Sequence, residues 1–322
     1  MLKIKKTSKL RIIFMGTSAL AEVILESLLK EKYNIVAVFT QPDKKSGRKK
    51  ELKISPVKKM AQKHKISLFQ PEKFDEDVIS EVKKIKPDLI IVAAYGKILP
   101  KEILEIPGFR SLNIHASLLP KFRGPSPIQN ALMAGEKETG ITIMLMNERI
   151  DTGDIIARKK IKISPEDNLK TLSLGLSKLG AKLLFKIIPL WIEGKIERKK
   201  QDETQVTLCQ LIERSDGQIF WNEPAENIYN KYRALYPWPG VFCFWENAGS
   251  LERIKFQKIS LQKDGPQNKR RAGEVFQLEN KIGIQTASSA VIADIIQLEG
   301  KKPLSAKEFI NGYPSFIGSV LK

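Results

Sequence analysis

The stretch LRIIFMGTSALAEVILESLLKEKYNIVAVFT (residues 10–40) contains a strand, a helix and a second strand in succession. Its two ends, residues 10–15 and 34–40, are short apolar runs typical of buried strands. Between them, residues 18–31 place apolar side chains at the spacing of one helix face. Two strands that are joined by a helix lie parallel in one sheet, so this stretch predicts an α/β fold.

The same alternation continues as far as residue 146. The further predicted strands are residues 65–69, 88–94, 111–116 and 140–146, and the further predicted helices are residues 55–64, 75–86 and 126–134. We therefore expect a mostly parallel sheet with helices on both faces, which binds its ligands beyond the carboxyl ends of the strands. The first strand is followed by Gly16-Thr17-Ser18 and not by GxGxxG, so a dinucleotide site has no support.

A long helix and a second domain follow. Ser164-Pro165-Glu166-Asp167 has the residue types of a helix start, and the helix is expected to run through the 170s and 180s with Gly175 and Gly180 as weak points. We expect a first domain at residues 1–197, a polar linker at 198–214 and a second domain at 215–322. The second domain is predicted to be a small β-barrel, from short runs at residues 241–245, 252–259, 272–278 and 281–287.

Composition fits two folded domains. The chain has 322 residues, 42% of them hydrophobic and 28% charged, which excludes a disordered or collagen-like protein. No apolar run approaches the roughly 18 residues of a membrane span, and the N-terminus lacks the apolar core and cleavage site of a signal peptide. The two cysteines, Cys209 and Cys243, cannot make a disulfide framework. We expect a cytoplasmic protein, without a membrane contact, that acts as a monomer.

The formal net charge of +19 is concentrated in the first two thirds of the chain. Residues 1–200 contain 40 basic and 22 acidic residues, whereas residues 201–322 contain 15 and 14. Such an excess attracts phosphate polyanions, but it equally fits a chain whose lysines are scattered over helix faces. Charge alone therefore does not decide between a nucleic-acid-binding protein and a protein with many surface lysines.

Two polar side chains stand at the end of the predicted strand at residues 111–116. Because side chains alternate along a strand, Asn113 and His115 lie on one face. An amide can donate a hydrogen bond to a developing oxyanion, and an imidazole exchanges protons near neutral pH. The pair is a candidate for acyl chemistry, with a histidine that merely caps a strand end as an equal alternative. The other histidine, His64, lies in a lysine-flanked helix and is interpreted as a surface residue.

Asp151 is a third candidate. It lies in RIDTGDII, in a turn marked by Gly153, and alone it would be interpreted as a turn former. Near Asn113 and His115, its carboxylate would orient the imidazole and help to carry a proton. The sequence has no nucleophile elbow, Walker loop or metal-ligand cluster. We therefore expect direct transfer between two bound substrates, without a metal or a covalent enzyme intermediate.

Around these residues, SLNIHASLLPKFRGPSPIQNALMAGEKETGITIMLMNERIDTGDII resembles the signature of the formyltransferases that use 10-formyltetrahydrofolate. Within that family the chain is most similar to the members that act on methionyl-tRNA. RIIFMGTSALAEVILESLL resembles the opening strand and helix, and IVAAYGKILPKEIL resembles the segment beside the folate pocket. DGQIFWNEPAENIYNKYRALYPWPGVF and GKKPLSAKEFINGY are similar to the start and end of the C-terminal domain, so the resemblance covers nearly the whole chain.

The resemblance implies a Rossmann-like formyltransferase domain followed by an OB-like β-barrel. It implies transfer of the formyl group from 10-formyltetrahydrofolate, as a co-substrate, to the methionine amine of initiator Met-tRNA. The family's catalytic residues fall on Asn113, His115 and Asp151. The first two would stabilise the tetrahedral oxyanion, and Asp151 would hold the histidine and assist proton transfer towards N10 of the folate.

The resemblance also implies contacts to both substrates. Folate would lie, largely against main-chain groups, at Tyr95, Ser117, Leu118, Leu119, Pro120, Asn147, Glu148, Arg149 and Ile150. Arg123 and Gly124 would shape the mouth of the site. The tRNA acceptor arm would receive the loop at residues 41–50 with Lys44, Lys45, Arg48, Lys49 and Lys50. Lysines bind phosphates as point charges, whereas arginine also pairs with or stacks on bases, so Arg48 is the candidate discriminator.

Three alternatives stay open at this point. A glycinamide ribonucleotide transformylase has no β-barrel extension, and residues 215–322 argue against it. A sugar-nucleotide formyltransferase carries such an extension, but the context Pro127-Ile128-Gln129 and the basic loop argue against that reading. A non-catalytic RNA-binding relative is disfavoured by the intact Asn113, His115 and Asp151.

In the PWPG motif, Trp238 is interpreted as a packed ring, as is Trp221.

Overall fold

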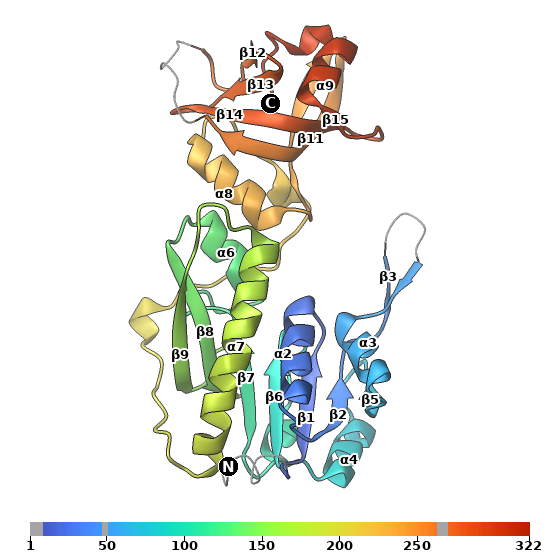
Figure 1. Ribbon diagram of the computed structural model, residues 1–322, viewed down its shortest axis with the longest axis vertical. Helices are drawn as coiled ribbons and strands as arrows, with labels where there is room; N and C mark the ends of the chain where they lie inside the picture. Colours follow the sequence, from blue (N-terminus) through green and yellow to red (C-terminus); the bar gives the residue numbers. More distant parts are fainter. Residues whose placement is uncertain (1–8, 47–50, 263–269) are drawn as a thin grey trace. The chain divides into compact units, whose positions relative to one another are not determined.

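The computed structural model describes residues 9–46, 51–262 and 270–322 and divides the chain into two compact units (Figure 1). The first unit consists of Met1–Pro127, Lys137–Ser164 and Lys170–Gln210. The second unit consists of Ile128–Glu136, Pro165–Leu169 and Leu211–Lys322. Each unit has its own sheet.

A seven-stranded sheet forms the centre of the first unit, with the strand order β5-β2-β1-β6-β7-β8-β9. Its strands are β1 (Ile12–Gly16), β2 (Ile35–Phe39), β5 (Leu68–Phe69), β6 (Leu89–Ala93), β7 (Ser111–His115), β8 (Glu138–Leu145) and β9 (Ile155–Lys162). Neighbours from β5 to β7 pair in parallel, whereas β8 and β9 pair antiparallel. The predicted mostly parallel α/β sheet is therefore confirmed. Strands β1 and β6 are buried along their whole length, as expected for central strands that are covered on both faces.

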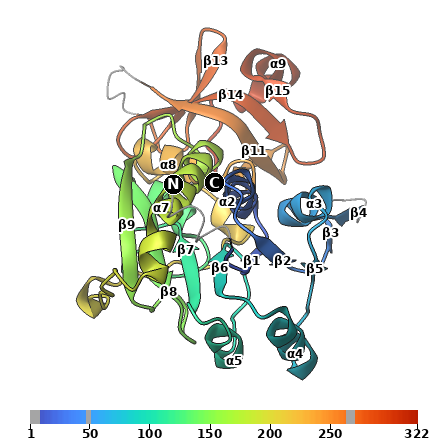
Figure 2. The same ribbon diagram turned by 60° about the horizontal axis from the view of Figure 1, so that its bottom comes forward.

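Helices cover both faces of this sheet, with α2 and α7 on one face and α4 and α5 on the other (Figure 2). The helices of the first unit are α2 (Ala19–Lys30), α3 (Pro56–Lys63), α4 (Glu76–Ile85), α5 (Lys101–Glu105) and α7 (Leu169–Ile192). Ile13 and Met15 of β1 share a buried apolar cluster with Val82 of α4 and Ile103 of α5. On the opposite face, α7 approaches β7 and β8 so closely that a Cβ added to Gly180 would lie 3.1 Å from Ile114.

Local sequence signals fix the starts of α2, α3 and α4. Ser18, Ser55 and Asp75 each accept a backbone N–H at the first turn of α2, α3 and α4. The predicted start of the long helix near Ser164 is wrong, because α7 begins at Leu169. The carbonyl oxygens of Pro165 and Asp167 accept hydrogen bonds from the Arg233 guanidinium, which holds these residues outside a helix.

The basic segment after β2 forms a hairpin of β3 (Lys44–Ser46) and β4 (Glu51–Lys53), where the sequence predicted a loop. A partly buried polar network holds the base of this hairpin. Lys58 of α3 donates to Asp43 (2.5 Å) and to Gln70 (2.7 Å), and Gln70 in turn donates to the other oxygen of Asp43 (3.0 Å). The hydrogen bonds from Lys58 and Gln70 lower the pKa of Asp43, with that from Lys58 the larger effect.

The second unit is an antiparallel half-barrel with the strand order β10-β11-β14-β13-β12, to which β15 adds by pairing with β14. This agrees with the predicted smaller β domain. Its elements are α6 (Pro127–Met133), α8 (Ala225–Leu235), β10 (Val241–Asn247), β11 (Ser250–Leu261), β12 (Val275–Leu278), β13 (Lys281–Gln285), β14 (Ala290–Leu298), β15 (Leu304–Ser305) and α9 (Ala306–Gly312). Register irregularities around Lys258 bend the long strand β11, and this curvature lets one sheet enclose a core.

Aromatic side chains fill the core of the second unit. Trp245 and Phe309 both contact Phe316 edge to face, with ring centroids 5.1 and 5.0 Å apart. Trp221 is buried and packs edge to face on Phe256, as predicted. The prediction that Trp238 is packed is wrong, because this residue is 55% exposed.

Candidate active site

Strand β7 presents Asn113 and His115 on one face near its carboxyl end, beside β6 and β8. Asp151 lies in the turn between β8 and β9. The amide nitrogen of Asn113 lies 3.4 Å from Oδ1 of Asp151, and Nδ1 of His115 lies 3.4 Å from the same oxygen. The structure thus brings the three predicted catalytic residues into one cluster, around a carboxylate that is 11% exposed.

Asp151 is held from the main chain as well. The backbone N–H of Gly124 donates to its Oδ2 at 2.9 Å, so this carboxylate accepts from both Gly124 and Asn113, with Nδ1 of His115 3.4 Å away. The residue has a φ of +52°, a left-handed conformation that is uncommon outside glycine and recurs at functional sites. Two residues later, Gly153 has room for no side chain, because a Cβ would lie 1.7 Å from the carbonyl oxygen of Leu145.

Both ring nitrogens of His115 face an oxygen atom. Nε2 lies 2.9 Å from the carbonyl oxygen of Phe122, opposite the Nδ1 that faces Asp151. These contacts fix the plane of an imidazole that is only 6% exposed.

The loop after β7 is held from within the protein. Ser117 donates from its hydroxyl to the carbonyl of Lys121 (2.6 Å), and its own carbonyl accepts from the Thr142 hydroxyl (2.7 Å). The Leu119 side chain is fully buried, and the Leu119–Pro120 peptide bond is cis. Of the predicted folate contacts in this loop, Leu118 is partly exposed and Ser117, Leu119 and Pro120 are buried.

The other predicted folate contacts differ in exposure. Asn147, Glu148, Arg149 and Ile150 form an exposed turn, in which the Asn147 side chain accepts from the Arg149 backbone N–H (3.2 Å). Tyr95, by contrast, is buried in the apolar cluster of the first unit, and burial raises the pKa of its phenol. Its hydroxyl has no hydrogen-bond partner among the described residues, while its carbonyl accepts from Gln41 at 2.9 Å.

Of the predicted tRNA contacts, the structure describes only two. Lys44 is exposed on β3, and Lys45 follows it on the same strand. Arg48, Lys49 and Lys50 lie outside the described residues.

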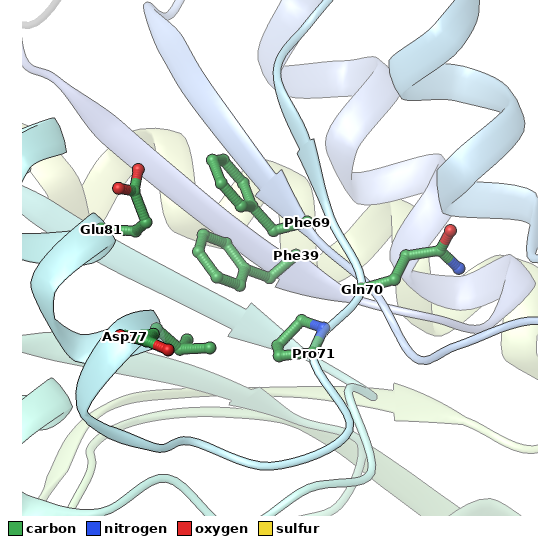
Figure 3. A pocket seen from close by; sticks show the side chains of 7 residues that line it. Phe39, Phe69, Gln70, Pro71, Asp77 and Glu81 are labelled. Atoms are coloured by element: carbon green, nitrogen blue, oxygen red, sulfur yellow. The ribbon is translucent and has the colours of Figure 1, made fainter.

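A cavity of about 310 Å³ opens elsewhere in the first unit (Figure 3). The stacked rings of Phe39 and Phe69, 4.8 Å apart, form its apolar wall, and Asp77 and Glu81 of α4 lie at its edge. None of the predicted catalytic or folate-binding residues lines this cavity.

Sequence reasoning missed the segment at residues 199–209, which it assigned to the linker. This segment runs past the cluster: the Gln201 side chain donates to the carbonyls of Asp151 and Gly153, each at 2.8 Å. Cys209 is buried against the loop, and its backbone N–H donates to the carbonyl of Arg123 at 2.8 Å. Burial raises the pKa of the Cys209 thiol. A Cβ on Gly124, whose φ is +121°, would lie 2.2 Å from the Cys209 carbonyl oxygen, so this close approach requires glycine.

Arg123, which was predicted to shape the mouth of the site, has a buried side chain. It is 5% exposed, and its guanidinium donates to Gln201 (2.9 Å) and to Glu203 (2.8 Å).

Among residues 9–46, 51–262 and 270–322, no helix is long and apolar enough to span a membrane. Nor does this part of the chain hold a group of three or more His, Cys, Asp or Glu side chains suited to a metal ion.

Comparisons with known proteins agree with this arrangement. Residues 9–188 match the family model described as formyl transferase, and residues 211–314 match the model of the formyl transferase C-terminal domain. Among solved structures, the N-formyltransferase from Helicobacter canadensis has a TM-score of 0.65 at 20% identity, covering 88% of this chain and 98% of that one. HypX from Aquifex aeolicus, in complex with tetrahydrofolic acid, has a TM-score of 0.64 at 17% identity, covering 96% and 48%. These two similarities show the fold alone.

Relatives found by sequence have a higher identity to this chain than these two solved structures. The methionyl-tRNA formyltransferase of Caldicellulosiruptor saccharolyticus is 42% identical over 313 residues, which cover 96% of this chain and 99% of the relative. That of Halalkalibacterium halodurans is 41% identical over 317 residues, covering 97% and 98%. With both domain models matched and full-length relatives at this identity, the chain belongs to the methionyl-tRNA formyltransferase family.

Proposed function

We propose that this enzyme transfers the formyl group of 10-formyltetrahydrofolate to the α-amine of methionine on initiator Met-tRNA, with Asn113, His115 and Asp151 as its catalytic residues. The observation that carries the assignment is the convergence of an amide, an imidazole and a carboxylate. Both nitrogens lie 3.4 Å from one oxygen of Asp151, at the carboxyl end of a central strand. Ligands of open α/β sheets bind at this edge.

The chemistry follows from these three groups. When the methionine amine attacks the formyl carbon, a C–N bond forms and the formyl oxygen becomes an oxyanion. Asn113 donates an N–H to that oxygen, and the imidazole of His115 helps to stabilise it. One such donor contributes about 3 to 4 kcal/mol to catalysis. As the tetrahedral centre collapses, the bond to N10 of the folate breaks, and the proton that leaves the amine is transferred to N10 with help from Asp151.

The folate donor is proposed to bind along main-chain groups near Tyr95, at the loop from Ser117 to Pro120 and at the turn from Asn147 to Ile150. Three features fit a folate there. The turn is exposed, the loop is held rigid from inside the protein, and Arg149 adds a cation for the glutamate tail. The Tyr95 hydroxyl is a buried polar atom without a partner among the described residues. The bound folate supplies an activated formyl group, whereas the protein orients it and excludes water.

The tRNA is proposed to bind at the basic segment of residues 41–50 through Lys44, Lys45, Arg48, Lys49 and Lys50, with Arg48 as the residue that discriminates the initiator. The concentration of positive charge in residues 1–200 supports this, because phosphate contacts dominate nucleic-acid affinity. We also propose domain limits at residues 1–197 and 215–322, and a monomer in the cytoplasm, where charged tRNA is available.

The assignment is tested by an acceptor panel. Purified enzyme and 10-formyltetrahydrofolate are mixed with charged initiator tRNA, charged elongator Met-tRNA, glycinamide ribonucleotide or an amino-sugar nucleotide, and formyl transfer is measured. Exclusive use of initiator Met-tRNA is expected. Transfer to the small amines alone would keep the active site and overturn the tRNA acceptor, whereas no transfer to any acceptor would overturn the proposed catalysis.

A further inference from the structure

The segment at residues 199–209 makes a closed circuit of hydrogen bonds with the proposed catalytic cluster. The Gln201 amide nitrogen donates to two main-chain carbonyls of one turn, those of Asp151 and Gly153, each at 2.8 Å. Its amide oxygen accepts twice from Arg123, from Nε at 3.0 Å and from one Nη at 2.9 Å. The side chain therefore uses both ends of its amide to join two loops.

The second loop, residues 122–124, already touches the cluster. On one side of Arg123, the Phe122 carbonyl lies 2.9 Å from His115 Nε2. On its other side, the Gly124 N–H donates to Asp151 Oδ2 at 2.9 Å. Arg123 therefore lies between the two main-chain groups that set the position of the imidazole and of the carboxylate.

The turn at residues 151–153, which Gln201 binds, depends on hydrogen bonds from outside the turn to keep its conformation. Asp151 is left-handed at φ +52°, and such a conformation in a residue other than glycine persists only where the surroundings determine it. The carbonyls of Asp151 and Gly153 both accept from the side-chain amide of Gln201. Water molecules in place of this amide would bind the carbonyls but would not connect the turn to Arg123. The main chain of Arg123 is itself fixed, since its N–H donates to Thr207 at 2.9 Å.

We infer that Gln201 is a positioning residue of the formyl-transfer reaction, which sets the distance between Asp151 and His115 by tying the 151–153 turn to the 122–124 loop. This inference rests on the proposed roles of Asp151 and His115. Gln201 itself contacts neither of these side chains, so it acts through the main chain. Displacement of a reacting group by about 1 Å costs on the order of 100-fold in rate.

One substitution distinguishes the hydrogen bonds of the Gln201 amide nitrogen from those of its amide oxygen. In Gln201→Glu, the carboxylate still accepts from Arg123 but can no longer donate to the carbonyls of Asp151 and Gly153. Gln201→Met has a similar size and loses both links. The matched control is Gln210→Glu, which makes the same change at an exposed position directly after this segment.

Steady-state kinetics with initiator Met-tRNA should give a kcat for Gln201→Glu that is roughly 10- to 100-fold below wild type, with the KM of both substrates within about twofold. Gln210→Glu should match wild type. A wild-type kcat in Gln201→Glu, or an equal loss in Gln210→Glu, would overturn the inference.

A readout without activity uses the fact that the chain has only two histidines. In proton–carbon NMR spectra, the imidazole resonances of His115 should move in Gln201→Glu and Gln201→Met, while those of His64 stay in place. Unmoved His115 resonances in a folded variant would also overturn the inference. Failure of the proposed function gives a different result, since wild-type enzyme would then transfer no formyl group while the NMR comparison still reports on the position of His115.

Discussion

At the scale of single residues, the site is organised around one carboxylate rather than around the histidine. Asp151 lies within 3.4 Å of both Asn113 and His115 and accepts a main-chain N–H from Gly124. Its carboxylate is thus a fixed point from which an amide donor and an imidazole are both aligned. Preorganised donors of this kind need no rearrangement when charge develops during the reaction.

Replacing Asn113 by alanine removes one donor to the developing oxyanion. We expect kcat to fall by roughly 100- to 1000-fold, the usual cost of one such donor, with the KM for Met-tRNA within about twofold. Steady-state formylation assays measure both constants. The exposed Asn222→Ala is the control and should match wild type. A loss that appears only in KM would contradict the proposed role.

At the scale of secondary-structure elements, the base of the β3–β4 hairpin depends on the ion pair between Lys58 and Asp43, whose side chains are only 16% and 14% exposed. Since the pKa of Asp43 is lowered in the folded state, this pair stabilises the protein above the unfolded carboxyl pKa of about 4. The stabilisation is lost as the pH falls through the folded pKa.

Lys58→Met should therefore lower the free energy of unfolding at pH 7 by about 1 to 3 kcal/mol. The difference from wild type should shrink as the pH falls below about 4, the unfolded carboxyl pKa, towards the lowered pKa of Asp43 in the folded protein. Urea denaturation at pH 7, 5 and 3.5 measures this, with the exposed Lys59→Met as control. A difference that is independent of pH would show that Lys58 acts through packing alone.

Two glycines of α7 differ in how closely the helix approaches the sheet. A Cβ on Gly180 would meet Ile114 of β7 at 3.1 Å and Ile141 at 3.7 Å, whereas at Gly175 the nearest atom is 3.4 Å away. Gly180→Val should lower the free energy of unfolding by about 1 to 3 kcal/mol through overpacking. Gly175→Ala should raise it by up to about 1 kcal/mol through helix propensity. Equal effects in urea denaturation would contradict this account of the packing.

The same elements show why sequence predicts some parts of the fold and not others. Strands such as β1 and β6 are continuous apolar runs, so their pattern is unambiguous. Strand β9 was missed because only its first two residues are buried and charged residues fill the rest. The start of α7 was misplaced because Arg233, far along the chain, binds the carbonyls of residues 165 and 167.

A similar limit applies to the site. Asn113 and His115 share one strand, and Asp151 follows within the same signature, so sequence alone suggested their proximity. Gln201 is 50 residues beyond Asp151 and binds main-chain carbonyls. Side chains that recognise main-chain atoms leave no residue pattern in the partner, so their role is visible only in the structure.

At the scale of the whole molecule, the net charge of +19 is carried almost entirely by residues 1–200. Binding of tRNA that rests on phosphate contacts releases counterions and weakens steeply with salt. Between 50 and 200 mM salt, we expect the KM for Met-tRNA to rise at least about tenfold, while the KM for the folate donor changes by less than about threefold. Parallel changes in the two constants would contradict a charge-driven tRNA site.

The most direct test of the catalytic assignment is single-turnover formyl transfer by Asp151→Asn, with both substrates bound before the reaction starts. This variant keeps the size of the side chain and removes its charge. We predict a rate at least roughly 100-fold below wild type, with tRNA affinity within about twofold, because Asp151 aligns His115 and helps to move the proton. A rate close to wild type would contradict the claim that Asn113, His115 and Asp151 carry out the chemistry.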